Sequence, residues 1–343
     1  MIAFLLLCLA VDLSRFEAVM GPLPPRLKTP PMVEMINEVT LAGGVIRRQI
    51  VFIARDQDRV PAYLFLPAGQ GKHPAMLCLH QTTRIGKGQP AGLGDKPDLH
   101  YALELARRGY VTLAPDYPNF GDYAFDPYTH GYSSATMKGI ANHQRALDLL
   151  AAMPQVDPKR MGVIGHSLGG HNSLFLAAFD PRVKVAVTSC GFTAFARYYG
   201  GDLTGWSHKG YMPRIATAYA KDPQRMPFDF SDILAAIAPR AIFVNAPLHD
   251  SNFDVTGVRE TIAKVERLFK PGHLEVVYPD RAHEFPPDAR ESAYRFIDRH
   301  LRQSARRGPP LAIIRSAATT EGGETASTGL RCFEEACRAP GPR

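Results

Sequence analysis

Hydrophobic and polar positions divide residues 46–301 into two kinds of segment that alternate along the chain. Short apolar runs bounded by turn residues are typical of strands, and apolar residues at helical spacing are typical of helices. We predict strands at Ile46–Arg55, Val60–Leu66, Ala75–His80, Tyr110–Ala114, Arg160–Ile164, Val183–Ser189, Ala241–Ala246 and Leu274–Tyr278. We predict helices at Leu99–Arg108, Ser133–Met153, Leu168–Phe179, Val255–Phe269 and Ala289–Leu301. Strands that alternate with helices imply βαβ crossovers, so we expect a mostly parallel sheet with helices on both faces.

Residues 191–238 interrupt this alternation after the sixth predicted strand and are rich in aromatic side chains. We predict a small, cap-like helical insertion there, over the carboxyl ends of the strands, where such sheets bind ligands. Phe192 and Trp206 of the insertion, with Phe120 and Tyr123 of an earlier loop, are candidates to line a substrate pocket. The alternative is that these aromatic side chains pack inside the core, which is their commoner position.

The segment Gly165-His166-Ser167-Leu168-Gly169 fits the G-x-S-x-G pattern of a serine nucleophile. A predicted strand leads into it and a predicted helix leads out, so a sharp turn exposes the Ser167 hydroxyl above the sheet. Side chains at the two glycines would collide with neighbouring backbone. The Leu168 N–H then points toward a developing oxyanion, beside the positive end of the helix.

A serine hydroxyl needs a base, and the chain offers 12 histidines. We choose His283, because its loop follows the last predicted strand and reaches the edge of the sheet beside Ser167. His80 ends an interior strand and is better placed to shape a loop. His166 and His171 flank the nucleophile but are expected to project away from it. His249 lies too close to the candidate acid to be oriented by it.

The base must in turn be oriented by an acid. The loop after Ala241–Ala246 offers Asp250 and Asp254. Asp250 is favoured, because it follows the strand by a few residues, and Asp254 is placed to cap the helix that starts at Val255. A second oxyanion donor is expected from the backbone N–H of Gln81 or Thr82, although a polar turn without a catalytic part remains the alternative.

The composition and charge of the chain exclude several classes of protein. The chain has 343 residues, of which 45% are hydrophobic and 21% charged, which is ordinary for a globular protein. The net charge of +7 suggests nucleic-acid binding, but residues 302–343 alone carry seven Arg and four Glu, and the chain has no run of five like charges. We therefore expect neither a nucleic-acid nor a membrane partner, and no metal or organic cofactor; the pattern leaves the oligomeric state open.

The two ends of the chain differ from the middle. Residues 1–45 are expected to form a leader or helical arm, residues 46–301 the catalytic domain, and residues 302–343 a disordered tail. The apolar run Ile2–Val11 is too short to span a bilayer. We expect a cytoplasmic protein, with a secreted or periplasmic one as the alternative that this run leaves open.

The five cysteines are too few and too scattered for a disulfide framework. Cys78 and Cys190 lie in apolar runs and are expected to be buried thiols. Cys332 and Cys337 are close enough in the tail to pair, although nothing requires it, and Cys8 lies in the N-terminal run.

The order Ser167, Asp250, His283 along the chain is that of α/β-hydrolases. With the segments LCLHQT, ELARRGYVTLAPDYPNFG, VIGHSLGGHN, APLHDSNF and PDRAHEFP, the chain resembles the dienelactone-hydrolase and acetyl-xylan-esterase-like branch, which is related to the catalytic domain of prolyl oligopeptidases. The resemblance implies an α/β-hydrolase fold with an eight-stranded sheet, and ester hydrolysis.

The chain also departs from these families at named positions. Dienelactone hydrolases use a cysteine nucleophile where Ser167 stands, and glucuronoyl esterases carry an Arg where Leu168 stands. The 45 residues before the first predicted strand cannot build the propeller of a prolyl oligopeptidase. We therefore expect a serine carboxylesterase acting on small or medium acyl esters. The alternatives are a serine exopeptidase and a non-catalytic binding protein on the same fold.

Overall fold

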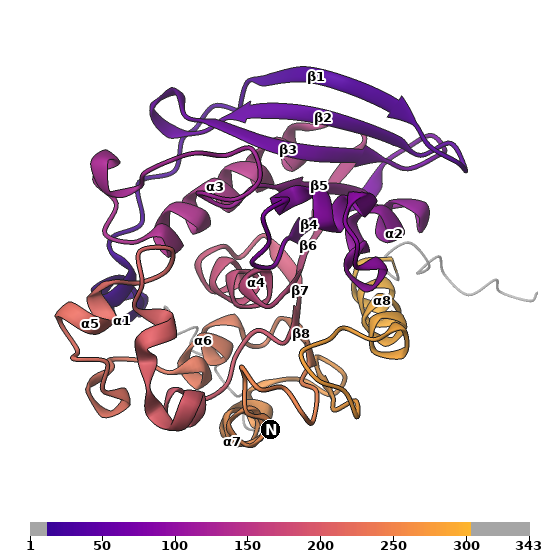
Figure 1. Ribbon diagram of the computed structural model, residues 1–343. Helices are drawn as coiled ribbons and strands as arrows, with labels where there is room; N and C mark the ends of the chain where they lie inside the picture. Colours follow the sequence, from indigo (N-terminus) through magenta and orange to yellow (C-terminus); the bar gives the residue numbers. More distant parts are fainter. Residues whose placement is uncertain (1–11, 303–343) are drawn as a thin grey trace, which may run out of the picture. The chain divides into compact units, whose positions relative to one another are not determined.

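The computed structural model describes residues 12–302, and within them nine strands form one mixed sheet (Figure 1). The strands are β1 Val33–Thr40, β2 Ile46–Ile53, β3 Arg59–Leu66, β4 His73–Leu79, β5 Val111–Pro115, β6 Val156–His166, β7 Val183–Ser189, β8 Ala241–Asn245 and β9 Leu274–Val277. Their order across the sheet is β1-β2-β3-β5-β4-β6-β7-β8-β9. The first three strands and β5 pair antiparallel, and every pair from β5 to β9 is parallel. The predicted α/β architecture is confirmed.

The prediction of eight strands was wrong by one, because β1 lies in the segment expected to be a leader. All eight residues of β1 are exposed, and the strand pairs only with β2 at the edge of the sheet. Its apolar residues, Val33, Met35, Ile36 and Val39, are exposed and neither form a continuous run nor alternate strictly, so the hydrophobic pattern did not reveal the strand. The expectations for Ile2–Val11, for Cys8, Cys332 and Cys337, and for the tail beyond residue 302 lie outside the described residues.

Helices cover both faces of the sheet. They are α1 Ser14–Met20, α2 Tyr101–Arg107, α3 Ala135–Ala152, α4 Leu168–Phe179, α5 Arg214–Thr217, α6 Phe230–Ile237, α7 Val255–Val265 and α8 Pro287–Leu301. Short helical turns lie at η1 Arg55–Gln57, η2 Gly86–Gly88, η3 Gln89–Leu93, η4 Pro97–Leu99, η5 Tyr128–His130, η6 Phe195–Gly201, η7 Leu203–Trp206, η8 Pro223–Arg225 and η9 Glu266–Leu268. Within residues 12–302, no helix has the length and hydrophobicity needed to cross a bilayer.

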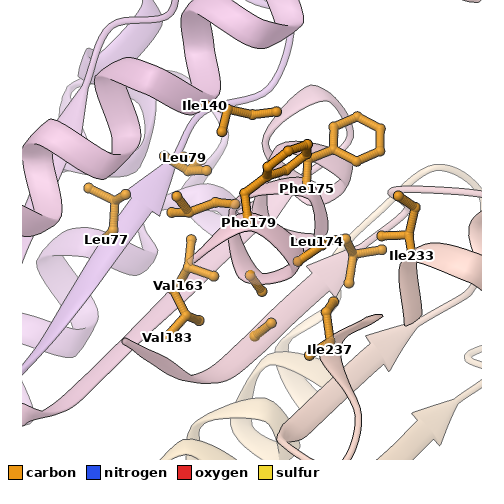
Figure 2. Packing of buried hydrophobic residues seen from close by; sticks show 14 of the residues in the cluster. Leu77, Leu79, Ile140, Val163, Leu174, Phe175, Phe179, Val183, Ile233 and Ile237 are labelled. Atoms are coloured by element: carbon orange, nitrogen blue, oxygen red, sulfur yellow. The ribbon is translucent and has the colours of Figure 1, made fainter. Parts of the chain in front are cut away.

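Two apolar clusters hold these layers together. One joins α1, α3, α4, α6 and α7 to one face of the sheet, and the other joins α2 and α8 to the opposite face. Figure 2 shows part of the first cluster, where Phe175 and Phe179 of α4 lie among Ile140 of α3 and Leu79 and Val163 of the sheet. Because every one of the twelve residues of α4 is buried, this helix is a rigid base for the turn that precedes it.

Residues 191–238 consist of η6, η7, α5, η8 and α6, so the expected helical insertion is present. Asp229 starts α6 with a capping box, in which its side chain and that of Asp232 each accept a backbone N–H. The two cysteines of the described region, Cys78 and Cys190, are buried free thiols, as the sequence predicted.

Candidate active site

Ser167 occupies a strained turn between the end of β6 and the start of α4. Its backbone angles are φ 54° and ψ −116°, a region that non-glycine residues rarely adopt. The Ser167 N–H donates to the carbonyl oxygen of Ser189 at 2.8 Å, which fixes the turn to the end of β7. This is the conformation that the G-x-S-x-G pattern predicts for a nucleophile.

Two glycines make the turn possible. A Cβ at Gly165 would lie 2.2 Å from the Gly169 carbonyl oxygen, and a Cβ at Gly169 would lie 1.9 Å from the Leu79 carbonyl oxygen. Atoms of a side chain cannot approach backbone so closely, which confirms the steric reason inferred for these glycines.

Asp250 and His283 form a hydrogen-bonded pair beside this turn. His283 Nδ1 lies 2.9 Å from Asp250 Oδ2 and 3.0 Å from Oδ1, and the backbone N–H groups of Asn252 and Phe253 donate to the same carboxylate. Burial by itself raises the pKa of Asp250, but His283 and the two N–H groups outweigh burial and hold it below its ordinary value. Asp250 is therefore a carboxylate that fixes Nδ1 of His283 as a donor and leaves Nε2 as the basic nitrogen.

The rival residues have other partners. The Asp254 side chain accepts the N–H of Thr256 at 2.6 Å and caps α7, which is the role that the sequence offered it. His249 pairs with Asp280 on the surface, where both side chains are largely exposed.

Ser167 and His283 face one cavity of about 750 Å³. Gln81 and Thr82 line the same cavity, and within residues 12–302 no hydrogen-bond acceptor is found for the backbone N–H of either. Leu168 is the first residue of α4, a position whose N–H has no partner within the helix. The structure thus brings together all the residues expected to activate the nucleophile or to bind an oxyanion.

His80 shapes the loop that carries Gln81. Its Nε2 accepts the N–H of Tyr117 at 3.0 Å, so Nδ1 carries the proton and donates to the Gln81 carbonyl oxygen at 2.6 Å. Burial lowers the pKa of His80, which keeps the ring neutral in this arrangement. The ring ties the loop after β4 to the end of β5.

The sequence did not reveal a buried polar network that supports His283. Asn245, the last residue of β8, donates through Nδ2 to Ser189 Oγ and to the Glu284 carbonyl oxygen, each at 2.9 Å. Ser189 Oγ in turn lies 2.9 Å from Nδ1 of His166. The network joins the carboxyl ends of β6, β7 and β8 to the His283 loop. A polar residue that ends an apolar strand at this edge is the signal that could have indicated it.

The four candidates for the pocket do not line the cavity. Tyr123, Phe192 and Trp206 are buried in apolar clusters, and Phe120 packs against His80 and Tyr117. For Tyr123, Phe192 and Trp206 the alternative of core packing applies, because large aromatic rings gain most when they are fully buried, and Phe120 is partly buried against a smaller cluster.

The insertion nonetheless supplies much of the wall. Tyr198, Gly205, His208 and Tyr211 of the insertion line the cavity, and so do residues 95–99. His166 and His171, which were expected to project away, also line it.

Cys190, Asp250 and His283 place three potential metal-ligand atoms within 4.8 Å of one another. Burial raises the pKa of the Cys190 thiol well above its ordinary value, and its Sγ donates to the Glu284 carbonyl oxygen at 3.3 Å. Since Asp250 and His283 are already hydrogen-bonded to each other, the donor set fits a proton-holding pair better than a metal site.

Comparison with known proteins identifies related sequences. The model of the prolyl oligopeptidase family matches residues 98–306. The Bacillus subtilis protein YtaP is 26% identical over 70% of this chain and 80% of its own length. The 4-O-methyl-glucuronoyl methylesterase of Podospora anserina is 24% identical over 68% of this chain. The chain spans 48% of that esterase and 41% of the Pseudomonas aeruginosa protein PA2218, another relative.

Solved structures share the fold. A glucuronoyl esterase from Solibacter usitatus superposes with a TM-score of 0.65 at 18% identity, covering 83% of this chain and 90% of that one. An acetyl xylan esterase from Paenibacillus sp. R4 gives a TM-score of 0.59 at 21% identity, covering 79% and 89%. At these identities the likeness establishes the architecture alone.

Proposed function

We propose, since this chain belongs to the prolyl oligopeptidase family, that it is a serine hydrolase that cleaves carboxylic esters through an acyl-enzyme on Ser167. The observation that carries the proposal is the Asp250–His283 pair, whose histidine faces the same cavity as the strained Ser167. A base already oriented by a buried acid, facing the same cavity as a half-buried serine hydroxyl, is the arrangement that acyl transfer requires.

In the proposed reaction, His283 Nε2 takes the proton of Ser167 as Oγ attacks the ester carbonyl. The oxyanion is bound by the N–H of Leu168 and by that of Gln81 or Thr82. Imidazolium gives its proton to the leaving alcohol, and the acyl group stays on Oγ. A water molecule, deprotonated by His283, then attacks the acyl carbonyl; the bond to Oγ breaks, the imidazolium returns the proton to Ser167, and the acid is released. Asp250 stabilises the imidazolium in both halves of the reaction.

Esters are favoured over peptides by the relatives. The Podospora anserina protein is named a methylesterase, and the fold neighbours are named glucuronoyl and acetyl xylan esterases. A cavity of about 750 Å³ accommodates small or medium acyl esters, since ligand pockets commonly measure ~300–1,000 Å³.

Hydrolysis of p-nitrophenyl acetate, butanoate and octanoate tests the proposal, with Ser167→Ala as the inactive variant. Ser207→Ala is the matched control, because Ser207 is a serine of the insertion that does not line the cavity. We expect Ser167→Ala to lose activity and labelling by a fluorophosphonate probe, and Ser207→Ala to keep both. Activity that survives Ser167→Ala, or faster cleavage of aminoacyl-p-nitroanilides than of esters, contradicts the proposal.

A further inference from the structure

His171 is a buried imidazole whose two ring nitrogens have no hydrogen-bond partner within residues 12–302. The residue is only 2% exposed, yet it lines the cavity that contains Ser167. It lies one turn after Ser167 on α4, a helix whose every residue is buried, so its position is fixed by the core.

Leaving such groups unpaired is costly. A buried polar group without a partner typically costs about 1–3 kcal/mol, and native proteins contain few of them. His171 lies among aromatic rings, with the Trp206 ring centroid 4.7 Å and the Tyr211 centroid 5.3 Å away. A purely structural position in this setting is filled more favourably by a Phe or Leu, so the imidazole at the cavity wall needs another explanation.

The ring is uncharged under physiological conditions. Burial lowers the pKa of His171 to about 3, against a smaller opposing effect of the Gly191 backbone, which lies near the ring but not in hydrogen-bond geometry. A neutral imidazole offers one N–H donor and one acceptor nitrogen. It suits a neutral partner that can both donate and accept.

A second unpaired atom belongs to another residue that lines this cavity. Gln81 Oε1 is buried without a partner within the described residues, and Gln81 lines the cavity. This oxygen is an acceptor only. A hydroxyl group can accept the N–H of His171 and donate its one proton to Gln81 Oε1, so these two uncharged groups are complementary to it.

We propose that His171 determines specificity by donating its ring N–H to a hydroxyl group of the ester substrate, whose own proton is accepted by Gln81 Oε1. This inference rests on the proposed ester hydrolysis, and it extends that function to hydroxyl-bearing esters as the preferred class. The rings of Trp206 and Tyr211 keep the imidazole in place.

Two pairs of esters of matched shape test the proposal, because each pair exchanges a methyl for a hydroxyl. On the acyl side the pair is p-nitrophenyl butanoate and p-nitrophenyl 3-hydroxypropanoate. On the alcohol side it is propyl acetate and 2-hydroxyethyl acetate, followed by pH-stat titration. We expect the wild type to prefer the hydroxyl member of at least one pair by about tenfold in kcat/KM, the value of one well-formed hydrogen bond.

His171→Phe is expected to remove that preference, whereas His171→Gln, which keeps a donor and an acceptor, is expected to retain part of it. Phe175→Leu is the matched control, since Phe175 packs against His171 on the same helix but does not line the cavity. We expect it to leave the ratio within each pair unchanged. If His171→Phe does not fold, Gln81→Met serves in its place and is expected to lower the same ratio.

The outcomes separate the two ideas. The role of His171 is overturned, and ester hydrolysis stands, if the wild type hydrolyses the esters without a preference in either pair. The same conclusion follows if the preference is unchanged in His171→Phe, or in Gln81→Met where that variant replaces it. If the wild type hydrolyses none of the four esters, the proposed function fails first and the inference fails with it.

Discussion

The carbonyl oxygen of Leu79 lies so close to Gly169 that a Cβ on the glycine would be 1.9 Å from it. Helix α4 and strand β4 therefore meet backbone to backbone at this point. The contact places the turn of Ser167 directly beside the loop of Gln81 and Thr82, which follows Leu79 in the chain. The relative position of nucleophile and oxyanion donors thus depends on a residue without a side chain.

Gly169→Ala is expected to separate these two elements. A methyl group that meets backbone atoms cannot be relieved by a rotamer change, so we expect a loss of about 3 kcal/mol in the free energy of unfolding. Displacement of the donors is expected to lower kcat/KM by about 100-fold. Gly88→Ala is the control, because a Cβ there would only reach ordinary contact, 3.6 Å from Ile85. Urea denaturation and p-nitrophenyl butanoate hydrolysis measure both effects, and equal behaviour of the two variants would contradict the steric argument.

Asp250→Asn is expected to lower kcat by about 10,000-fold, because an amide N–H facing His283 would favour the wrong tautomer of the ring. Asp254→Asn is the comparison that decides which aspartate orients the base. Asp254 caps α7, and its substitution is expected to cost at most about 1 kcal/mol of stability while kcat is retained. Steady-state kinetics with thermal unfolding of both variants measures this, and a large fall in kcat for Asp254→Asn alone would reverse the assignment.

Much of the fold follows from periodicity, since buried parallel strands and the helices that cover them have strong apolar patterns. The strand β1 was missed because its four apolar residues, all exposed, neither form a continuous run nor alternate strictly. The motif around Ser167 predicted the candidate nucleophile. The loops that follow two predicted strands indicated Asp250 and His283, which the structure places in a hydrogen-bonded pair.

The residues that line the cavity could not be predicted from periodicity or from motifs. Aromatic residues such as Phe195 and Trp206 lie in short helical turns of the insertion, but the sequence does not tell which side of such a turn faces the core. The role of Asn245 was also hidden, because its partners, Ser189 and Glu284, are 56 and 39 residues away in the chain. Contacts of this kind are set by the sheet order and not by local pattern.

Asn245→Leu is expected to loosen the loop that carries His283. The substitution removes both donors, to Ser189 Oγ and to the Glu284 carbonyl oxygen, at a position with 1% exposure. We expect kcat to fall about tenfold while KM changes little, because a sub-ångström shift of the base affects the chemical step. Asn172→Leu, a buried asparagine on α4 that does not line the cavity, is the control for stability. If KM rose about tenfold while kcat stayed unchanged, Asn245 would instead shape the binding site.

Lys87→Met is expected to destabilise the fold strongly. The Lys87 ammonium is 2.7 Å from Asp116 Oδ2, and the side chains are 2% and 0% exposed. Removing the cation leaves a buried carboxylate unpaired, which typically costs about 3–5 kcal/mol. The double variant that also carries Asp116→Asn is expected to regain part of the lost free energy of unfolding. Arg197→Met, which breaks an exposed pair with Glu260, is expected to cost at most about 1 kcal/mol. Equal losses in the two single variants, measured by urea denaturation, would refute the distinction.

Stability is expected to fall as the solution is acidified below about pH 6.5. Burial lowers the pKa values of His143, His166 and His171 to about 3, so the folded chain leaves these rings neutral where the unfolded chain protonates them. The unfolded state then binds more protons, which makes the free energy of unfolding rise with pH and decrease on acidification. Each ring contributes about 1.4 kcal/mol per pH unit once the pH is well below 6.5.

His143→Gln isolates one of these contributions, because His143 is buried in α3 and does not line the catalytic cavity. Urea denaturation at several values between pH 5 and pH 8 gives the slope of unfolding free energy against pH. We expect the variant's slope below pH 6 to be shallower than that of the wild type by about 1.4 kcal/mol per unit, which is one proton. Above pH 7.5 the two slopes should coincide, since both folded and unfolded rings are then neutral. An unchanged slope at low pH would mean that His143 takes up a proton within the folded protein.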